Sequence, residues 1–357
     1  MPNVEVKKEI NEEENKDKLK RKKIFKMIGW SGLAIFLLFC LFLERRPSGT
    51  VRNPEFGQTF SKIFAKDLGL DWKEAYIAIL DDLQPKSVKI PIYWQDIEFQ
   101  RGKYRFGDYD WIVNEAKNRG VGVVLVVGRK VPRWPECHAP QWANNDTPVD
   151  RREALLRYIK KTVDHYDKLE NLEMWQVDNE PFLPFGDCPD SFSVDFLERE
   201  IETVRSVDPN HKIMVTDSGE LSIWVRAAKR GDIFGTTMYR VIWKEPFGYF
   251  KYPLPPVFFW IKANIVHLFY PGKPIIGSEL QAEPWGPKLI PDLTIEEQFE
   301  SMSLNQLKEN IAYAKKVGFS QNYMWGSEWW YWLKTKQNHP EFWEEVRKLS
   351  WPQQYSK

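Results

Sequence analysis

Short apolar runs rich in β-branched residues recur along most of the chain and alternate with amphipathic segments. The runs predict eight strands, at residues 56–60, 87–94, 121–128, 172–180, 212–220, 233–240, 273–280 and 322–330. The segments between and after them predict helices at residues 72–83, 109–119, 152–169, 193–207, 221–229, 256–269, 295–317 and 340–349. Several strands are apolar at nearly every position, as expected for a parallel sheet that is buried on both faces.

The number and order of these elements predict an α/β fold. Eight strands alternating with eight helices over about 300 residues match the size of a (β/α)8 barrel, or TIM barrel. A doubly wound open sheet is the alternative, but it uses fewer strands, and no glycine-rich phosphate loop follows a strand in this sequence. We therefore expect one barrel domain at residues 56–357.

The beginning of the chain has a different pattern. Residues 1–26 are polar and highly charged, and residues 27–43 then carry no charge, over a length that suffices to cross a bilayer as one helix. A cleaved signal peptide is the alternative, but the following residues offer no small-residue cleavage site. Basic side chains are concentrated before the apolar run, which predicts a cytoplasmic tail at 1–26, a transmembrane signal anchor at 27–43, a linker at 44–55 and a barrel outside the cytoplasm.

Composition narrows the function classes. The net charge of +1 argues against a nucleic-acid binder, and aromatic residues, at 15%, suit sugar rings as well as a protein core. Five scattered histidines and three cysteines make a multi-ligand metal site unexpected, so we predict no metal and no cofactor. Cys40 lies in the apolar run, whereas Cys137 and Cys188 lie in the predicted outer domain, where either a disulfide or two free thiols are compatible with the sequence.

Two of the predicted strands end in a glutamate. Glu180 follows the fourth strand and Glu279 ends the seventh, so both are expected at the C-terminal mouth of a barrel, where chemistry takes place in this fold. Glycoside hydrolysis needs such a pair of carboxyl groups. Asp178 is expected to be structural, because strand alternation turns it away from Asn179, and Glu283 is a reserve candidate.

The motifs around these glutamates resemble the retaining glycoside hydrolases of clan A, a set of (β/α)8-barrel families that includes cellulase-like and β-galactosidase-like enzymes. The resemblance rests on WQVDNEP at 175–181 and KPIIGSE at 273–279, together with the segment 93–125, and covers about residues 56–335. It implies that Glu180 is the acid/base, that Glu279 is the nucleophile and that Asn179 holds the 2-hydroxyl of the sugar.

The same resemblance implies further site residues. Tyr239 is expected to bind the nucleophile, and Trp325 to form the aromatic floor under the reacting sugar, although core packing is an alternative for both. The chain departs from the clan at Thr237, where histidine is frequent, and at Lys89, where arginine is common. Arg129 is a possible replacement for that arginine, or a substrate contact.

The predicted function is a retaining glycoside hydrolase that cleaves a β-linked poly- or oligosaccharide by double displacement. A transglycosylase that uses the same two glutamates and a non-catalytic glycan-binding barrel are the alternatives. The expected partners are carbohydrate and, through residues 27–43, the lipid bilayer, with no nucleic acid and no obligate protein partner. Residues 245–269 could form a substrate platform, a bilayer contact or a buried sixth helix. The tryptophans expected on loops at the mouth suit a sugar cleft or a packed lid: Trp134, Trp142, Trp285, Trp329, Trp330 and Trp332.

Overall fold

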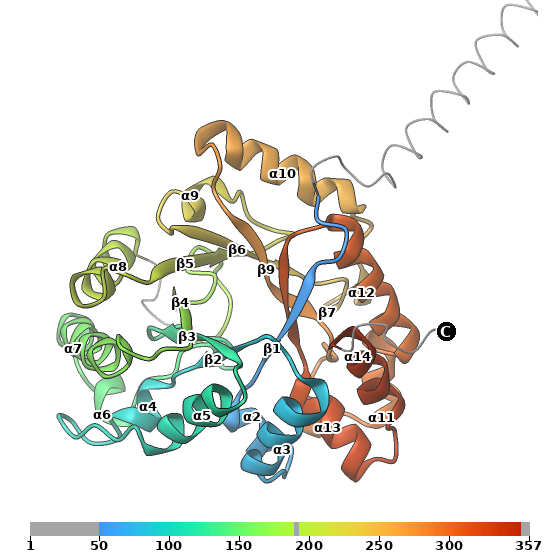
Figure 1. Ribbon diagram of the computed structural model, residues 1–357, viewed down its shortest axis with the longest axis horizontal. Helices are drawn as coiled ribbons and strands as arrows, with labels where there is room; N and C mark the ends of the chain where they lie inside the picture. Colours follow the sequence, from blue (N-terminus) through green and yellow to red (C-terminus); the bar gives the residue numbers. More distant parts are fainter. Residues whose placement is uncertain (1–49, 189–192, 351–357) are drawn as a thin grey trace, which may run out of the picture.

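The structure, a computed structural model, describes residues 50–188 and 193–350. Eight parallel strands close into a barrel, and helices surround it (Figure 1). In barrel order the strands are β1 (Glu55–Thr59), β10 (Gln321–Trp325), β9 (Ile275–Gln281), β6 (Ile233–Met238), β5 (Lys212–Asp217), β4 (Leu172–Val177), β3 (Gly122–Val127) and β2 (Ser87–Pro91). The predicted (β/α)8 barrel is therefore confirmed.

The outer layer consists of helices that return the chain between strands. They are α2 (Lys62–Asp67), α3 (Trp72–Ala78), α4 (Trp94–Ile97), α5 (Gly107–Asn118), α6 (Gln141–Asn144), α7 (Pro148–Tyr166), α8 (Val194–Val207), α9 (Val225–Ala228), α10 (Pro256–Phe269), α11 (Ile295–Ser301), α12 (Leu304–Val317), α13 (Ser327–Lys336) and α14 (Glu341–Ser350). A π-helical turn, η1 (Ile79–Leu83), extends α3, and a 3-10 turn, η2 (Ile290–Asp292), precedes α11. Many of these helices follow an N-cap residue whose side chain accepts a hydrogen bond from a backbone N–H of the first turn. Thr147 has this role for α7, and Ser193 has it for α8.

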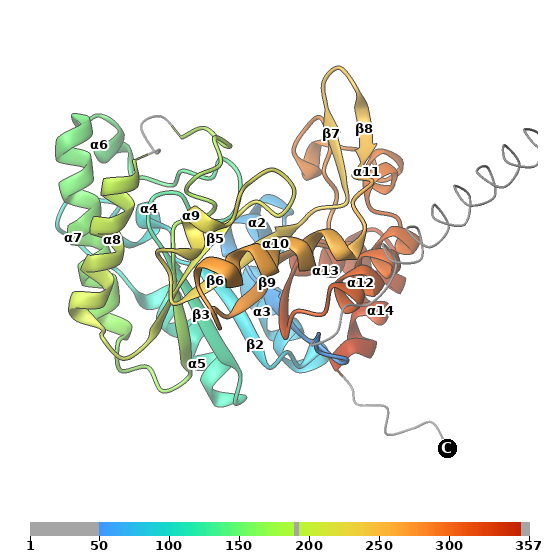
Figure 2. The same cartoon turned by 90° about the horizontal axis from the view of Figure 1, so that it is seen from above.

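The structure differs from the predicted elements mainly in the last strand, in one long helix and in an added hairpin. The last strand ends at Trp325 instead of residue 330, because Gly326 turns the chain with a φ of 144° and α13 begins at Ser327. The predicted helix at 295–317 is divided into α11 and α12, since Ser303 caps a new helix by accepting a hydrogen bond from Gln306. An antiparallel hairpin that the sequence did not predict, β7 (Val241–Lys244) with β8 (Gly248–Lys251), projects from the body (Figure 2).

The interior of the barrel is packed with side chains. A cluster from the first half or the middle of the strands fills it, consisting of Val124, Met174, Met214, Ile233, Ile276 and Tyr323. A larger apolar cluster lies between the strands and the surrounding helices. Because apolar residues close the lower part of the interior, the polar side chains at the C-terminal strand ends lie together above it, at the mouth.

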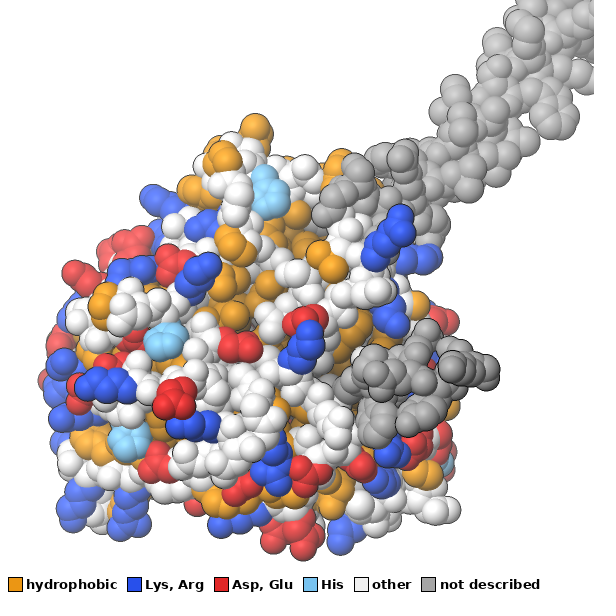
Figure 3. Space-filling view, viewed as in Figure 1, with side chains coloured by type: hydrophobic (Ala, Val, Ile, Leu, Met, Phe, Trp, Pro, Cys, Tyr) orange, Lys and Arg blue, Asp and Glu red, His pale blue; other side chains and the backbone are white. Residues whose placement is uncertain are grey.

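The aromatic segment at 245–269 contributes half of the hairpin and helix α10. One side of α10 is buried through Val257, Phe259, Ala263 and Val266. The opposite side exposes large apolar residues, of which Leu268 is the most exposed at 79%, and hydrophobic side chains gather there in Figure 3. The interpretation as a buried helix therefore holds for one side only, and the predicted contact with a bilayer stays a prediction.

The chain enters the barrel beside the C-terminal end of α12. The backbone N–H of Val51 donates to the carbonyl of Gly318 at 3.0 Å, and that of Glu55 to the carbonyl of Ser320 at 2.9 Å. Residue 50 is thus held at the end of the barrel opposite the mouth. The predicted tail and anchor at 1–43 lie outside the described residues. Within 50–188 and 193–350, every helix is too short or too polar to cross a bilayer.

Candidate active site

The chain makes a sharp turn where β4 ends, and this turn presents Glu180 to the mouth. Asp178 and Glu180 have φ values of 53° and 43°, in the left-handed region that side chains other than glycine seldom occupy. The turn is fixed by hydrogen bonds: Glu180 N–H donates to Thr216 Oγ1 at 2.9 Å, and Lys130 Nζ donates to the Glu180 carbonyl at 3.0 Å. Strain of this kind persists only where the surroundings enforce it, and it concentrates at functional sites.

Glu279 lies on β9, and two neighbouring strands support its carboxylate. Lys89 of β2 places Nζ 3.3 Å from Oε1 and also donates to the Ser278 carbonyl at 2.8 Å. Tyr239, just after β6, donates its hydroxyl to Oε2 at 3.0 Å, the contact that the resemblance implies. Lys89 thus supplies the positive charge beside Glu279 where clan members commonly have arginine. Both carboxylate oxygens of Glu279 therefore have a fixed partner, one an amine and the other a phenol hydroxyl.

Glu180 is in a different environment. Its Oε1 accepts a hydrogen bond from Thr237 Oγ1 at 3.1 Å, so the threonine found in place of histidine contacts this residue. Burial, followed by the negative charges of Glu279 and Glu136, raises the pKa of Glu180 well above its usual value. A carboxyl group with a raised pKa, beside a second carboxyl group that has cationic and hydroxyl partners, is the kind of pair that glycoside hydrolysis uses.

A third carboxyl group in the site was missed by the sequence analysis. Glu136 lies in the loop between β3 and α6, and its Oε2 accepts a hydrogen bond from Asn179 Nδ2 at 3.1 Å. Burial and the charge of Glu279 raise the pKa of Glu136 to about 8. The available signal was the one acidic residue in the loop at 128–140 after a barrel strand, next to Cys137.

Glu136 belongs to a tight hairpin at residues 130–138. Lys130 and Cys137 form an isolated antiparallel bridge, and Val131 N–H donates to the Glu136 carbonyl at 2.9 Å. A disulfide joins Cys137 to Cys188, with the two Cα atoms 5.2 Å apart, so the alternative of two free thiols is excluded. The disulfide fastens the loop after β4 to the hairpin after β3. Both loops border the mouth.

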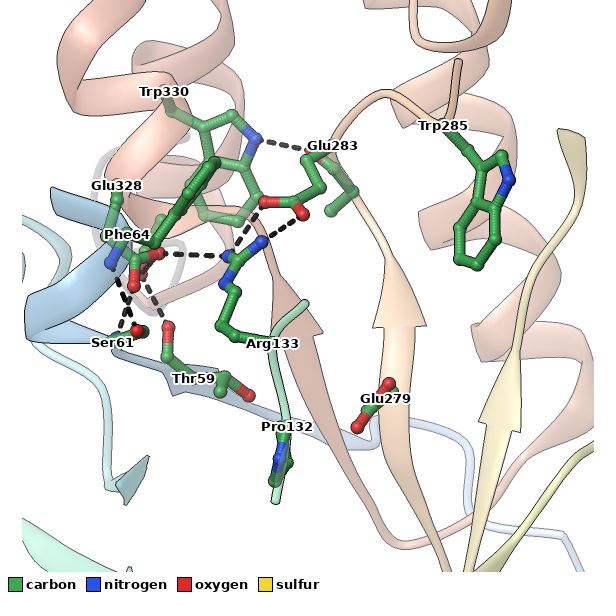
Figure 4. A network of polar contacts seen from close by, with 12 residues as sticks. Thr59, Ser61, Phe64, Pro132, Arg133, Glu279, Glu283, Trp285, Glu328 and Trp330 are labelled. Atoms are coloured by element: carbon green, nitrogen blue, oxygen red, sulfur yellow. Dashed lines mark hydrogen bonds and ion pairs between the residues drawn. The ribbon is translucent and has the colours of Figure 1, made fainter. Parts of the chain in front are cut away.

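Arg133, at the turn of the 130–138 hairpin, organises a second network of charges (Figure 4). Its Nη2 lies 2.9 Å from Glu283 Oε2 and 3.6 Å from Glu328 Oε2. Its guanidinium also lies 4.2 Å from the ring centre of Trp325. Glu283, the reserve candidate, is thus engaged in an ion pair, whereas Glu279 stands apart from this network in Figure 4.

Aromatic side chains form a row beside the carboxyl groups. The ring of Trp134 lies 6.0 Å from that of Phe185, which lies 5.4 Å from that of Trp285, and Trp285 in turn lies 5.4 Å from Tyr239. Trp134 is 53% exposed and offers a free face at the rim. Trp329 and Trp330 were expected on a loop at the mouth. They are instead fully buried in α13, where they pack as core residues.

Arg129 is not brought together with the two glutamates. It lines a small cavity between the sheet and helices α7 and α8, where Asp178 and Glu200 are also found. We call Arg129, Asp178 and Glu200 the outer cluster. Burial raises the pKa of both acids, and Arg129 partly offsets this effect. The expected structural role of Asp178 agrees with this position, and the suggested substrate contact of Arg129 finds no support in it.

Within 50–188 and 193–350, no three or more His, Cys, Asp or Glu side chains are grouped so that they could hold an ion. The polar groups of the mouth pair with one another, as carboxyl groups with Lys89, Arg133, Tyr239 and Asn179.

The fold and the site together define a (β/α)8 barrel with paired carboxyl groups at the ends of β4 and β9. In a comparison with known protein families, residues 90–233 match the model of glycosyl hydrolase family 10. This segment runs from β2 to the start of β6 and includes Asn179 and Glu180, whereas Glu279 lies beyond it. The prediction of a glycosidase agrees with this match.

Individual relatives and solved structures are also similar to this chain, at low sequence identity. Endo-1,4-beta-xylanase 3 of Hypocrea jecorina is 26% identical over 163 residues, which are 43% of this chain and 44% of that protein, so the chain spans less than half of its length. The structure of GH5_18 from Streptomyces cattleya in complex with GlcNAc has a TM-score of 0.54 at 14% identity, covering 77% of this chain and 71% of that one. Xylanase 10B from Thermotoga petrophila in complex with xylobiose has a TM-score of 0.51 at 17% identity, covering 77% and 83%. The likeness to the solved structures shows the barrel fold.

Proposed function

We propose that this barrel is a retaining glycoside hydrolase that acts on a β-linked polysaccharide or oligosaccharide. The observation that carries the proposal is the unequal support of two buried glutamates at one mouth. Glu279 contacts a lysine and a tyrosine hydroxyl, whereas Glu180 is surrounded by negative charge and contacts a threonine hydroxyl. The family match and the xylanase relative support the same reaction class.

In the proposed reaction, the two glutamates act in sequence. Glu279 attacks the anomeric carbon while Glu180 gives its proton to the departing glycosidic oxygen, and a covalent glycosyl-enzyme forms. Glu180, now ionised, removes a proton from water, which displaces Glu279 and releases the sugar with retained configuration. Asn179 holds the 2-hydroxyl, and Trp325 lies beneath the ring. The aromatic row from Trp134 to Trp285 would bind neighbouring sugar units through their apolar faces.

The test is sugar release by the full-length protein from xylan, other β-linked polysaccharides and aryl β-glycosides. We expect activity on at least one substrate, with retained anomeric configuration by NMR, and a loss of about a thousandfold or more in Glu279→Gln. Glu200→Gln is the matched control, because Glu200 is also a buried glutamate but lies in the outer cluster. Glycan binding without activity in all three proteins would instead identify a binding barrel, and sugar transfer to an added acceptor would identify a transglycosylase.

We further propose that residues 27–43 anchor the protein in a membrane and that the barrel lies outside the cytoplasm. The Cys137–Cys188 disulfide supports this placement, because disulfides persist mainly in oxidising compartments. The test is protease treatment of sealed cells or vesicles. The barrel should be digested from outside while an epitope tag before residue 26 stays protected, and the opposite pattern would reject this orientation.

A further inference from the structure

The 130–138 hairpin brings an acidic side chain into the proposed active site that neither the family match nor the pairing of Glu180 with Glu279 requires. We propose that Glu136 is a positioning residue of this site, which fixes the amide of Asn179 and adds a third acidic group that acts on Glu180 and Glu279. The inference rests on the proposed glycosidase function and deepens it by assigning a role to a residue outside the catalytic pair.

The first argument is the contact with Asn179. The Asn179 amide is held from both sides, because Nδ2 donates to Glu136 at 3.1 Å while Oδ1 accepts from Gln176 Nε2 at 3.3 Å. These bonds define which end of the amide faces Glu136. A residue that is to hold a sugar hydroxyl needs such a fixed orientation before substrate arrives. Glu136 therefore acts on the substrate through Asn179.

The second argument is the way in which the chain holds Glu136 in place. Its backbone has a φ of 73°, which is unfavourable for a glutamate, and its side chain is only 6% exposed. Gly186 packs directly on it, since a Cβ atom at position 186 would lie 2.6 Å from the Glu136 Cβ. The disulfide between the next residue, Cys137, and Cys188 joins the same two loops. A buried acid in a strained conformation costs stability, which indicates a role at the site.

The third argument is the charge around it. The titratable groups that act electrostatically with Glu136 come from several elements at the mouth: Lys89 of β2, Lys130 of its own hairpin, Glu180 after β4, Tyr239 after β6 and Glu279 of β9. The two lysines are committed to other groups, Lys89 to Glu279 and Lys130 to the carbonyls of Glu180 and Leu183. When Glu136 ionises, its charge opposes ionisation of Glu180 and so extends the pH range in which Glu180 keeps its proton.

The experiment compares pH profiles of kcat/KM for the parent and Glu136→Gln, in the full-length protein and with a substrate that the parent cleaves. The glutamine can still accept the hydrogen bond from Asn179 but carries no charge. We expect the alkaline limb of the profile to move to lower pH by about 0.5–1 unit, because Glu180 loses its proton more readily without the neighbouring charge. Glu136→Ala also removes the contact, and should lower kcat by about tenfold with little change in KM.

The matched control is Glu200→Gln, an equally conservative change at a buried glutamate that is 1% exposed and lies in the outer cluster. The alkaline limb of the kcat/KM profile of Glu200→Gln should coincide with that of the parent. An unshifted limb in Glu136→Gln, with an unchanged melting temperature, would overturn the proposal.

If the parent cleaves no substrate, the proposed function fails by itself, and Glu136 remains testable by carboxyl titration with ¹³C NMR. The Glu180 resonance should then titrate at lower pH in Glu136→Gln than in the parent. Identical titration curves would reject the role of Glu136.

Discussion

The mouth and the outer cluster contain carboxyl groups that are equally buried but differently used. Glu180 and Asp178 are separated by one residue, both have a left-handed backbone, and burial raises the pKa of each. Asp178 points into the wall between the sheet and the helices, where it meets Glu200 and the charge of Arg129. Glu180 points into the mouth, where the negative charges of Glu279 and Glu136 raise its pKa further and the charge of Lys130 partly offsets them.

Burial and a raised pKa therefore do not by themselves identify a catalytic acid. A pair of buried acids with a structural role, such as Asp178 and Glu200, also has raised pKa values. In the outer cluster, the charge of Arg129 partly offsets this rise. What distinguishes Glu180 is its place at the C-terminal strand ends, together with a second carboxylate, Glu279, that has cationic and hydroxyl partners. The comparison can be tested by changing one region at a time.

The largest contrast is expected between Glu180→Gln and Asp178→Asn. Both substitutions replace a carboxyl group by an amide of the same shape, two residues apart. Glu180→Gln should lower kcat/KM by about 100- to 10,000-fold for substrates with poor leaving groups, and less for aryl glycosides that need little protonation. Asp178→Asn should stay within a few-fold of the parent. Kinetics on both substrate classes check this, and equal losses in the two variants would remove the distinction between the regions.

A smaller effect is expected from breaking the disulfide, which fastens two loops of the mouth and does not touch the outer cluster. Cys188→Ala opens a connection across 51 residues, and should lower the free energy of unfolding by about 2–5 kcal/mol. Denaturant unfolding measures the loss, and the parent under reducing conditions should match the variant. Activity should fall as well, since Glu136 adjoins Cys137. Full stability after reduction would contradict the structure.

The smallest effect is expected in the outer cluster itself. Glu200 has a pKa well above its usual 4.5 in the folded protein, so the folded state holds a proton that the unfolded state releases as the pH rises. The parent should therefore lose stability as the pH increases above about 4.5, through this group, and Glu200→Gln should not. Relative to the parent, the variant should gain a few degrees in melting temperature between pH 5 and pH 8. Parallel melting curves would show that Glu200 is ionised in both states.

The eight strands could be predicted because each is a short apolar run, and the two strand-end glutamates followed from the strands. Glu136 could not be predicted in this way, since its burial results from a loop that a disulfide and Gly186 hold over it, and neither contact is visible as a local pattern. The β7–β8 hairpin was missed for a related reason, because its strands of four residues have no buried face that imposes alternation.

The two arginines after β3 show most directly where prediction from the strand pattern stops. Arg129, as the residue at the end of the predicted third strand, was expected near the mouth. The structure turns Arg129 into the wall and brings Arg133, four residues later, to Glu283 and Trp325. The positive φ of Arg133, 104°, reverses the direction of the chain there. A strand-based pattern fixes side-chain direction only as far as the strand continues.

The entry of the chain beside α12 has a practical consequence. The backbone N–H of Val51 is hydrogen-bonded to Gly318 at the closed end of the barrel, and the mouth with its carboxyl groups lies at the other end. Any support joined before Val51, whether a resin bead, an electrode or a fused scaffold protein, leaves the rim unobstructed. An enzyme immobilised by its N-terminus would therefore present its mouth to the surrounding solution.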